Sequence, residues 1–108
     1  MESGKRWTVS DKHGNRIYLT QERWEHIIEP LNHPEMAAFE QELQETIRSG
    51  NRVQDPFNPQ KYRYSKTFGN LAEYNTHIVA IVLFRFSEQA GEIITNNYIV
   101  TAYQKEIG

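Results

Sequence analysis

Several side chains in this sequence could carry out acid–base chemistry on a phosphate. They are histidines, cations and hydroxyl groups spread over the chain: His26, His33, Arg63, Lys66, Thr101 and Tyr103. Histidine suits proton transfer near neutral pH because its reference pKa is about 6.5. Cations and hydroxyl donors stabilise charge that develops on a phosphate. We predict that these six residues are catalytic if the fold brings them together.

Cleavage of RNA through its own 2′-hydroxyl needs this set of groups. A base removes the hydroxyl proton, an acid protonates the leaving 5′-oxygen, and cations or hydrogen-bond donors stabilise the pentavalent phosphorane. The sequence contains no Walker loop, dinucleotide fingerprint, HExxH motif or nucleophile elbow. It has no cysteine, and no spacing of Asp, Glu and His typical of a metal site. We therefore expect neither a metal ion nor a cofactor.

The histidines and Arg23 lie in the predicted helical region. Arg23 and His26 are three residues apart and share a helix face, which is either a phosphate cation beside an acid–base histidine or a solvated surface. His33 lies between two predicted helices, immediately before Pro34. It is either a second acid–base group, held by the fixed backbone of the proline, or a residue that closes the turn.

The strand candidates depend on which sheet face is exposed. In a regular strand over residues 61–68, alternation gives two faces, with Tyr62, Tyr64 and Lys66 on one and Lys61, Arg63 and Ser65 on the other. Alternation cannot decide between Arg63 and Lys66. Tyr62 and Tyr64, with Arg23, are candidates for substrate binding. Thr101 and Tyr103 share a face with Ile99, either as phosphate donors or as residues that simply favour strands.

The elements that must position these groups follow from periodicity and turn residues. We predict a hairpin around residues 11–15, a helix from Thr20 to near Glu29, and a second helix from residues 32–35 to a closing Gly50. Strands are predicted at 52–54, 61–68, 77–86 and 93–104, with a bulge or interruption at Asn96–Asn97. The fold class is α+β, with the hairpin and two helices packed on a roughly four-stranded antiparallel sheet whose other face is open.

Length and charge limit the class of protein. The 108 residues predict a single domain, 1–108, with its core at about 15–104. The net charge of −2 argues against a strongly basic DNA-binding domain. Residues 20–50 carry seven acidic and two basic side chains, whereas residues 51–70 carry one acidic and four basic side chains. We see no apolar signal region, and the longest apolar run, 78–84, is too short for a membrane span, so we expect a cytoplasmic protein.

Four segments together resemble a known family: RIYLTQERWEHIIEPLNHPEM, IRSGNRV, KYRYSK and YIVTAY. They are similar to small bacterial and phage-associated proteins of the Barnase–EndoU–colicin–RelE-like nuclease superfamily, phage-type branch. The resemblance covers roughly residues 15 to 104, and its most specific part is WxHI, then HPEM, then IVTAY far downstream.

The resemblance implies helices followed by a four-stranded antiparallel sheet with an exposed catalytic face. It also implies a metal-independent ribonuclease, often a toxin or effector. His26 and His33 would match the helical histidines, Arg63 or Lys66 the basic strand residue, and Thr101 with Tyr103 the terminal hydroxyls. RNA and a cognate antitoxin, or another protein, are the expected partners. The alternatives are a protein-interaction module and an RNA-binding domain without turnover, and the sequence leaves the oligomeric state open.

Overall fold

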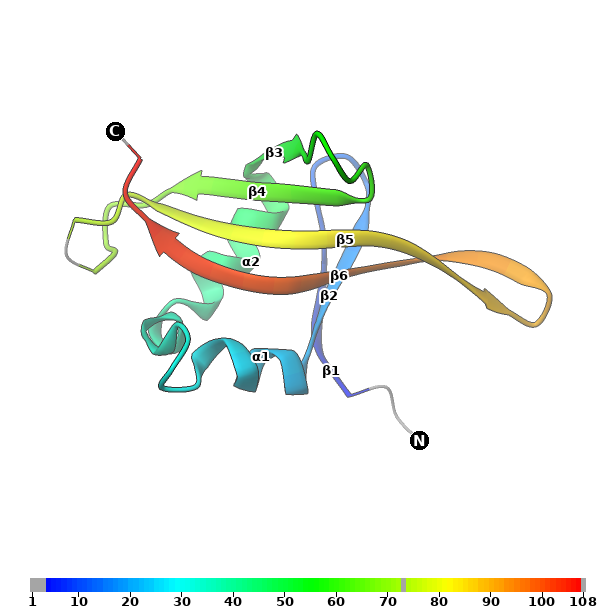
Figure 1. Cartoon of the computed structure of the whole chain (residues 1–108), viewed down its shortest axis with the longest axis horizontal. Coiled ribbons are helices and arrows are strands. Elements are labelled where there is room, and N and C mark those ends of the chain that lie inside the picture. Colours follow the sequence, from blue (N-terminus) through cyan, green and yellow to red (C-terminus); the bar gives the residue numbers. More distant parts are fainter. Residues whose placement is uncertain (1–3, 73, 108) are drawn as a thin grey trace.

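The computed structural model describes residues 4–72 and 74–107. This part of the chain forms an α+β fold with two α-helices, one 3-10 helix and six strands (Figure 1). In chain order these are β1 (Lys5–Ser10), β2 (Arg16–Thr20), α1 (Gln21–Ile28), η1 (Pro34–Ala38), α2 (Glu40–Ser49), β3 (Asn51–Gln54), β4 (Lys61–Thr67), β5 (His77–Gln89) and β6 (Glu92–Lys105).

The sheet is larger than predicted and is mixed. Its strand order is β1-β2-β6-β5-β4-β3, and β3 to β6 are antiparallel as expected. The N-terminal hairpin joins this sheet because β2 pairs in parallel with β6, through Ile17 with Asn97 and Tyr18 with Tyr98. Side-chain bonds reinforce this short contact, since the Tyr18 hydroxyl donates to Asn96 Oδ1 at 2.8 Å and Asn97 Nδ2 donates to the Arg16 carbonyl at 3.1 Å.

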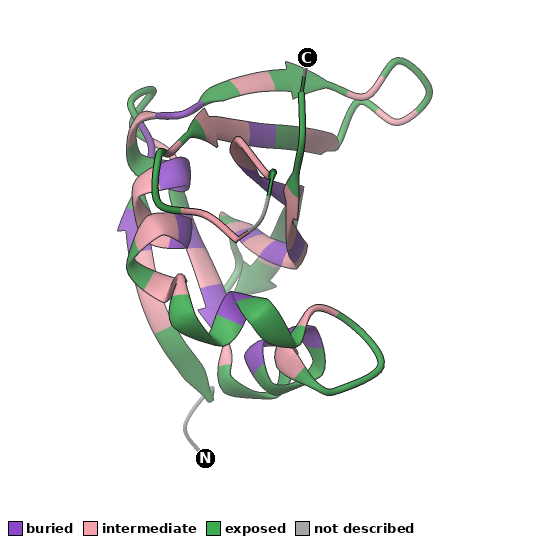
Figure 2. Cartoon of the chain, turned by 90° about the vertical axis from the view of Figure 1, so that its left-hand side faces the viewer, coloured by how far each residue is buried: buried purple, intermediate pink, exposed green. Residues whose placement is uncertain are grey.

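One face of β4 to β6 is buried and the other is not covered by a helix. Helix α2 lies behind the sheet in Figure 1 and packs on β4 and β5, and the β1–β2 hairpin crosses behind the same strands. Figure 2 shows buried residues in purple on α2 and on strands that enclose the same space. Fully buried side chains from each layer form the core, including Ile17, Leu19, Leu43, Ile47, Tyr64, Ile78 and Ile99. Burial of this apolar surface is the main driving force for folding.

The second predicted helix is in fact two elements. Pro34 starts the short η1, the chain breaks at Phe39, whose φ is −127°, and α2 then begins at Glu40. The predicted apolar stripe is still used, because Met36, Leu43 and Ile47 are all buried. The prolyl backbone favours the start of a helix, but the sequence pattern alone does not distinguish a 3-10 turn from an α-helical one.

Gly50 ends α2, but not in the left-handed conformation expected of a closing glycine. Its φ is −72° and its ψ 166°, which any residue adopts. Glycine is needed there for space, because a Cβ atom would lie 2.4 Å from the Thr46 carbonyl oxygen and 2.7 Å from that of Ser65. Both contacts are with backbone, so α2 and β4 would have to separate.

We expect Gly50→Ala to lower the free energy of unfolding by about 2 kcal/mol and the melting temperature by roughly 8 °C. Thermal and urea unfolding followed by circular dichroism would measure this loss. Gly69→Ala is the matched control, because a Cβ there meets nothing within 4 Å and φ is not left-handed. Equal stability of the two variants would contradict the steric explanation.

Strands β5 and β6 extend beyond the body of the protein as a two-stranded arm (Figure 1). The predicted turn at 87–91 is shorter than expected, since Ala90 and Gly91 alone make it, with φ of 52° and 81°. Two apolar side chains on the arm are largely exposed, Phe86 at 67% and Ile93 at 71%. None of the helices in the described part of the chain is long and apolar enough to cross a membrane.

Candidate functional site

The uncovered face of the sheet carries three of the six strand candidates. The alternation predicted for β4 is confirmed, because Tyr64 is buried in the core while Arg63 is exposed on the other side. Across β4, β5 and β6 the register pairs Arg63 with Ile81 and Ile81 with Thr101. Two residues further along β4, it pairs Ser65 with Val79 and Val79 with Tyr103. Directly opposite residues share a face. Arg63, Thr101 and Tyr103 therefore lie on one surface, which we call the open face.

A bulge in β6 brings Thr101 and Tyr103 to this surface. Ile81 pairs with Thr101 but Val82 pairs with Ile99, so Val100 is the extra residue. The predicted bulge at Asn96–Asn97 is wrong, since both pair regularly with β5. An extra residue reverses the alternation, so Ile99 points into the core at 1% exposure and Thr101 to the open face. The prediction that Ile99 shares their face is therefore also wrong.

His33 reaches the open face from the loop between α1 and η1. Its ring centroid lies 5.6 Å from that of Tyr103. The backbone on both sides is fixed, because His33 N–H donates to the Ile27 carbonyl at 2.9 Å and the His33 carbonyl accepts from Met36 N–H at 3.0 Å. The Asn32 side chain donates to the His26 carbonyl at 2.8 Å and holds the same loop against α1. His33 is thus held against β6 by local hydrogen bonds.

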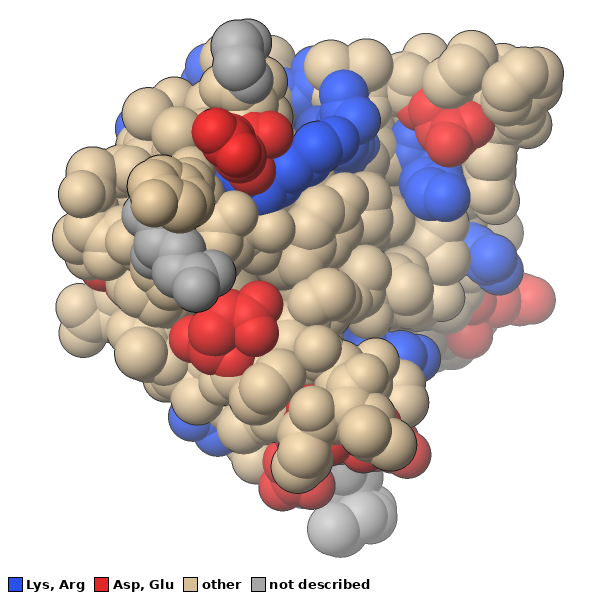
Figure 3. All heavy atoms as spheres, turned by 60° about the vertical axis from the view of Figure 1, so that its left-hand side comes forward, with Lys and Arg blue, Asp and Glu red and all other residues tan. Residues whose placement is uncertain are grey.

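Arg63 and Tyr103 line one hollow of about 250 Å³ together with Ile81 and Lys61. A second hollow, of about 340 Å³, also contains Arg63 and is bordered by Lys105. Within the described residues, Arg63 and Lys105 form no ion pair or side-chain hydrogen bond, whereas Lys61 Nζ lies 3.8 Å from Asp55. Figure 3 shows both Lys and Arg and Asp and Glu side chains at the borders of an uncharged area on this side of the molecule. The open face therefore combines unpaired cations with aromatic and hydroxyl groups.

His26 is not part of this arrangement. Its Nδ1 lies 3.4 Å from Glu29 Oε1, and 57% of its side chain is exposed. No described hydrogen bond, ion pair or ring contact joins it to β4 or β6. Arg23 lies closer, because it lines a hollow of about 170 Å³ with Tyr98 of β6. The helix face that the two residues share thus brings Arg23, but not His26, to the margin of the open face.

Three other predicted residues lie on the buried side of β4. Tyr64 is 1% exposed and its hydroxyl donates to Asp11 at 2.6 Å. The Tyr62 ring packs against Phe84, with ring centroids 4.8 Å apart, and the Arg52 guanidinium lies 4.6 Å from the Tyr62 ring and 5.7 Å from the Phe84 ring. Lys66 borders a separate polar hollow with His77. In this arrangement Tyr62 and Tyr64 have packing roles, and Lys66 is separated from Arg63 by the sheet.

The contact between Tyr64 and Asp11 ties the hairpin loop to β4. The Asp11 side chain is 1% exposed and also accepts hydrogen bonds from the backbone N–H groups of His13 at 2.9 Å and Asn15 at 2.8 Å. Burial alone would raise the pKa of Asp11, but the hydrogen bonds from Tyr64, Asn15 and His13 outweigh it and lower the pKa. Burial, followed by the bond to Asp11, raises the pKa of the Tyr64 hydroxyl. Both shifts belong to a structural contact in the core.

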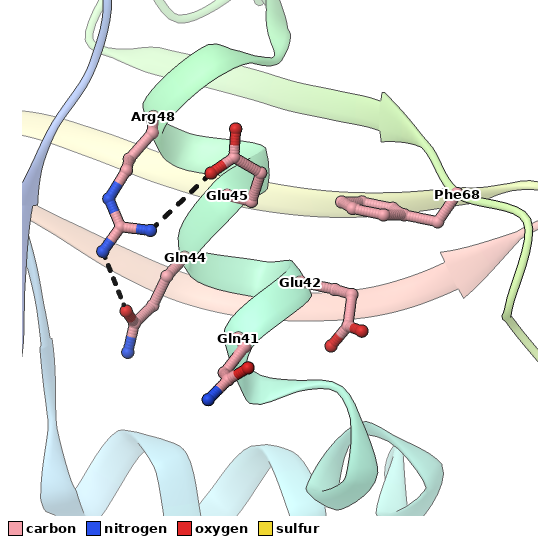
Figure 4. A pocket seen from close by; sticks show the side chains of 6 residues that line it. All are labelled: Gln41, Glu42, Gln44, Glu45, Arg48 and Phe68. Atoms are coloured by element: carbon pink, nitrogen blue, oxygen red, sulfur yellow. Dashed lines mark hydrogen bonds and ion pairs between the residues drawn. The ribbon is translucent and has the colours of Figure 1, made fainter.

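A further hollow, on α2, contains none of the predicted residues. It has about 500 Å³ and lies on the outer face of α2, lined by Glu and Gln side chains with Arg48 and Phe68 (Figure 4). Arg48 is already paired, with Glu45 at 3.7 Å and Gln44 at 3.1 Å. It is a shallow, solvated polar surface. Among the described residues, no three His, Asp or Glu side chains gather as a metal site would require.

The sequence-based candidates leave out four residues that the register places on the open face: Lys61, His77, Tyr98 and Lys105. Lys105 follows the predicted last strand, and Tyr98 lies before the bulge. The alternation of a regular strand places Tyr98 on the opposite face to Thr101, so only the bulge brings both to the same face.

Comparison with protein-family models, curated proteins and solved structures found no match.

Proposed function

We propose that this protein is a metal-independent ribonuclease of the Barnase–EndoU–colicin–RelE-like type, with its site on the open face. One observation carries the proposal. The His33 ring packs on Tyr103, and Tyr103 lines a hollow with Arg63. An acid–base group, a cation and a hydroxyl group thus come together from three elements that are distant in the sequence.

Each group has a role that its chemistry permits. His33 takes the proton of the 2′-hydroxyl as general base and then returns it to the leaving 5′-oxygen as general acid. Arg63 stabilises the negative charge of the phosphorane, because its guanidinium presents several donors and stays protonated. Thr101 and Tyr103 donate hydrogen bonds that orient the phosphate. Glu35 Oε2 lies 3.8 Å from His33 Nδ1.

The experiment is digestion of a mixed RNA substrate in excess EDTA, with analysis of the product ends. Attack by the 2′-hydroxyl predicts 2′,3′-cyclic phosphates and no cleavage of the 2′-O-methyl analogue. Cleavage of the methylated strand, or dependence on added divalent cation, would contradict the proposal. Absence of cleavage from every RNA class tested would also contradict it.

Arg63→Gln is expected to lower the cleavage rate by about two orders of magnitude, since it removes a cation from the developing charge. Lys66→Gln is the control on the same strand, because its side chain lies on the opposite face. We expect its rate to stay within about twofold of the unmodified protein. Equal losses in the two variants would show that the open face is not the site. Single-turnover kinetics separates this effect from binding.

A protein-interaction module is the second candidate function. The observation that favours it is the exposure of Phe86 and Ile93 on the projecting arm, where the register makes them diagonal neighbours on one face of the strand pair. Phe86→Ser should then abolish capture of a partner while RNA cleavage is unchanged. A partner could be a cognate antitoxin, and its binding to the unmodified protein should inhibit cleavage.

A further inference from the structure

A polar hollow of about 230 Å³ lies at the end of β4, beside the turn from α2 into β3. Six of the seven described residues that line it carry a polar or charged side chain, and none of the seven is acidic. The six are Ser49, Asn51, Ser65, Lys66, Thr67 and His77. We call it the Lys66 hollow, after its ammonium group. Hydrogen-bond donors around one cation are the groups that an anion requires.

The Lys66 hollow exists because β4 is longer than the strand beside it. Strand β3 begins at Asn51, which pairs with Ser65, so the end of β4 runs past the start of β3 (Figure 1). The turn before Asn51 fits closely against β4, since a Cβ atom on Gly50 would lie 2.7 Å from the Ser65 carbonyl oxygen. Backbone that belongs to two regular elements therefore borders the hollow.

The backbone of Thr67 supplies a fixed donor on this side. Phe68 N–H donates to the Thr76 carbonyl at 3.0 Å, so these two residues form a hydrogen-bonded pair between the strands. Such pairs alternate with pairs that are not hydrogen-bonded. Thr67, which lies opposite His77, therefore directs its N–H and carbonyl groups away from β5. No described strand lies on that side, because β3 begins opposite Ser65. The Thr67 N–H is thus available to a ligand.

The Lys66 side chain is half-buried, and within the described residues it makes no ion pair or hydrogen bond. The Thr67 hydroxyl lies 3.0 Å from His77 Nε2, which fixes the position of that hydroxyl. Outside the lining, Glu45 accepts a hydrogen bond from Ser49 Oγ at 2.6 Å and is also paired with Arg48 at 3.7 Å. The charge of Lys66 therefore has no countercharge in the described part of the hollow.

We propose that the Lys66 hollow binds a phosphate group with free oxygen atoms, either inorganic phosphate or a small phosphomonoester. Lys66 supplies the positive charge, and the Thr67 N–H and the Asn51 side chain donate hydrogen bonds to the oxygen atoms. This site lies at the edge of β4 and includes none of the groups proposed for catalysis. It therefore goes beyond the proposed function and does not depend on it.

The test is a calorimetric titration of inorganic phosphate into the full chain at neutral pH, with ionic strength held constant by chloride. Proton–nitrogen NMR spectra follow the Thr67 amide in parallel. We expect saturable binding that shifts this amide signal. Lys66→Gln should weaken the binding at least about tenfold, because it removes a charged donor. Arg63→Gln is the matched control, since it removes a cation from the other face of β4, and its affinity should stay within about twofold.

Glycerol 3-phosphate, titrated in the same way, distinguishes the two sources of the phosphate group. Tighter binding of the ester than of the ion would identify a phosphomonoester as the ligand, and the reverse order would identify free phosphate. Absence of saturable binding by both compounds would overturn the inference. Loss of binding in Arg63→Gln with retention in Lys66→Gln would also overturn it, because the anion would then lie on the open face.

A purely structural role for Lys66 gives a different result. Ser49, the last residue of α2, lines the same hollow, and a lysine can offset the partial negative charge at the end of a helix. In that case Lys66→Gln would lower the melting temperature equally with and without phosphate, and it would titrate like the unmodified protein. That outcome would overturn the inference. RNA cleavage is not measured in these experiments, so the proposed function is tested separately.

Discussion

Replacing His33 with alanine is expected to lower the rate of RNA cleavage by about two to four orders of magnitude, the usual contribution of a general acid or base. The ring contacts Tyr103 on the open face, whereas the ring of His77, which pairs with Lys105 on the same face, hydrogen-bonds to Thr67 and Thr76. Its loss leaves Arg63 and Thr101 in place, so substrate binding should change little. The measurement is the single-turnover cleavage rate in EDTA, with affinity for the 2′-O-methyl strand determined in parallel.

His26→Ala is the control for this experiment. The two histidines lie seven residues apart and both have a nearby carboxylate, Glu35 for His33 and Glu29 for His26. Only His33 contacts β6, so we expect His26→Ala to cleave RNA at close to the unmodified rate. If His26→Ala were inactive and His33→Ala active, the assignment of His33 as the acid–base group of the open face would be wrong. Unchanged melting temperatures in both variants would exclude unfolding as the cause of a loss.

Replacing Asp11 with alanine is expected to have the largest effect on stability, about 3 kcal/mol or roughly 12 °C in melting temperature. The change removes the acceptor for the Tyr64 hydroxyl and for two backbone N–H groups, and those donors are left without a partner in a region that excludes water. Arg52, whose guanidinium lies 3.8 Å from Asp11 Oδ2, also loses its countercharge. Asp55→Ala is the control, because Asp55 makes a similar turn but is more exposed. We expect it to cost less than about 1 kcal/mol.

The Asp11 carboxylate should also make the free energy of unfolding depend on pH. Its pKa is lower in the folded protein than the 3.8 of the free group, so the folded state favours the charged form. The stabilisation is therefore complete above about pH 5, and it is lost as the pH falls through 3.8 toward the folded-state pKa. Asp11→Asn should lose less stability than the unmodified protein between pH 5 and pH 3 in urea unfolding. Parallel pH profiles for the two proteins would show that other carboxylates are responsible.

Much of the local structure follows from the sequence. The helix that begins after Thr20 is set by its side chain, whose oxygen accepts from Arg23 N–H at 3.0 Å. The β4 alternation and the buried run in β5 follow from period-two patterns. These features depend on residues within a few positions of one another, and such interactions are visible in a linear sequence. The α+β class and the N-terminal hairpin were predictable for that reason.

The candidate site was predictable only as a set of residue types. The sequence placed Arg63 and Lys66 on opposite faces of one strand but could not choose between them, because the exposed face depends on where α2 packs. It could not separate His26 from His33 either, since one lies in the last turn of α1 and the other in the loop directly after it. Long-range contacts decide both questions: α2 covers the Lys66 side of β4, and the His33 ring packs on Tyr103.

The sequence by itself determined the helices, the strands and the chemistry available to them, because periodicity, capping and turn residues act locally. Tertiary structure alone decided that the hairpin extends the sheet through two parallel pairs, that Val100 is the bulge, and that Lys105 and Tyr98 border the open face. The physical reason is that strand pairing and register are settled by burying Ile17, Ile99 and their neighbours in one core. A bulge of one residue changes which side chains meet, and no local pattern in β6 marks its position.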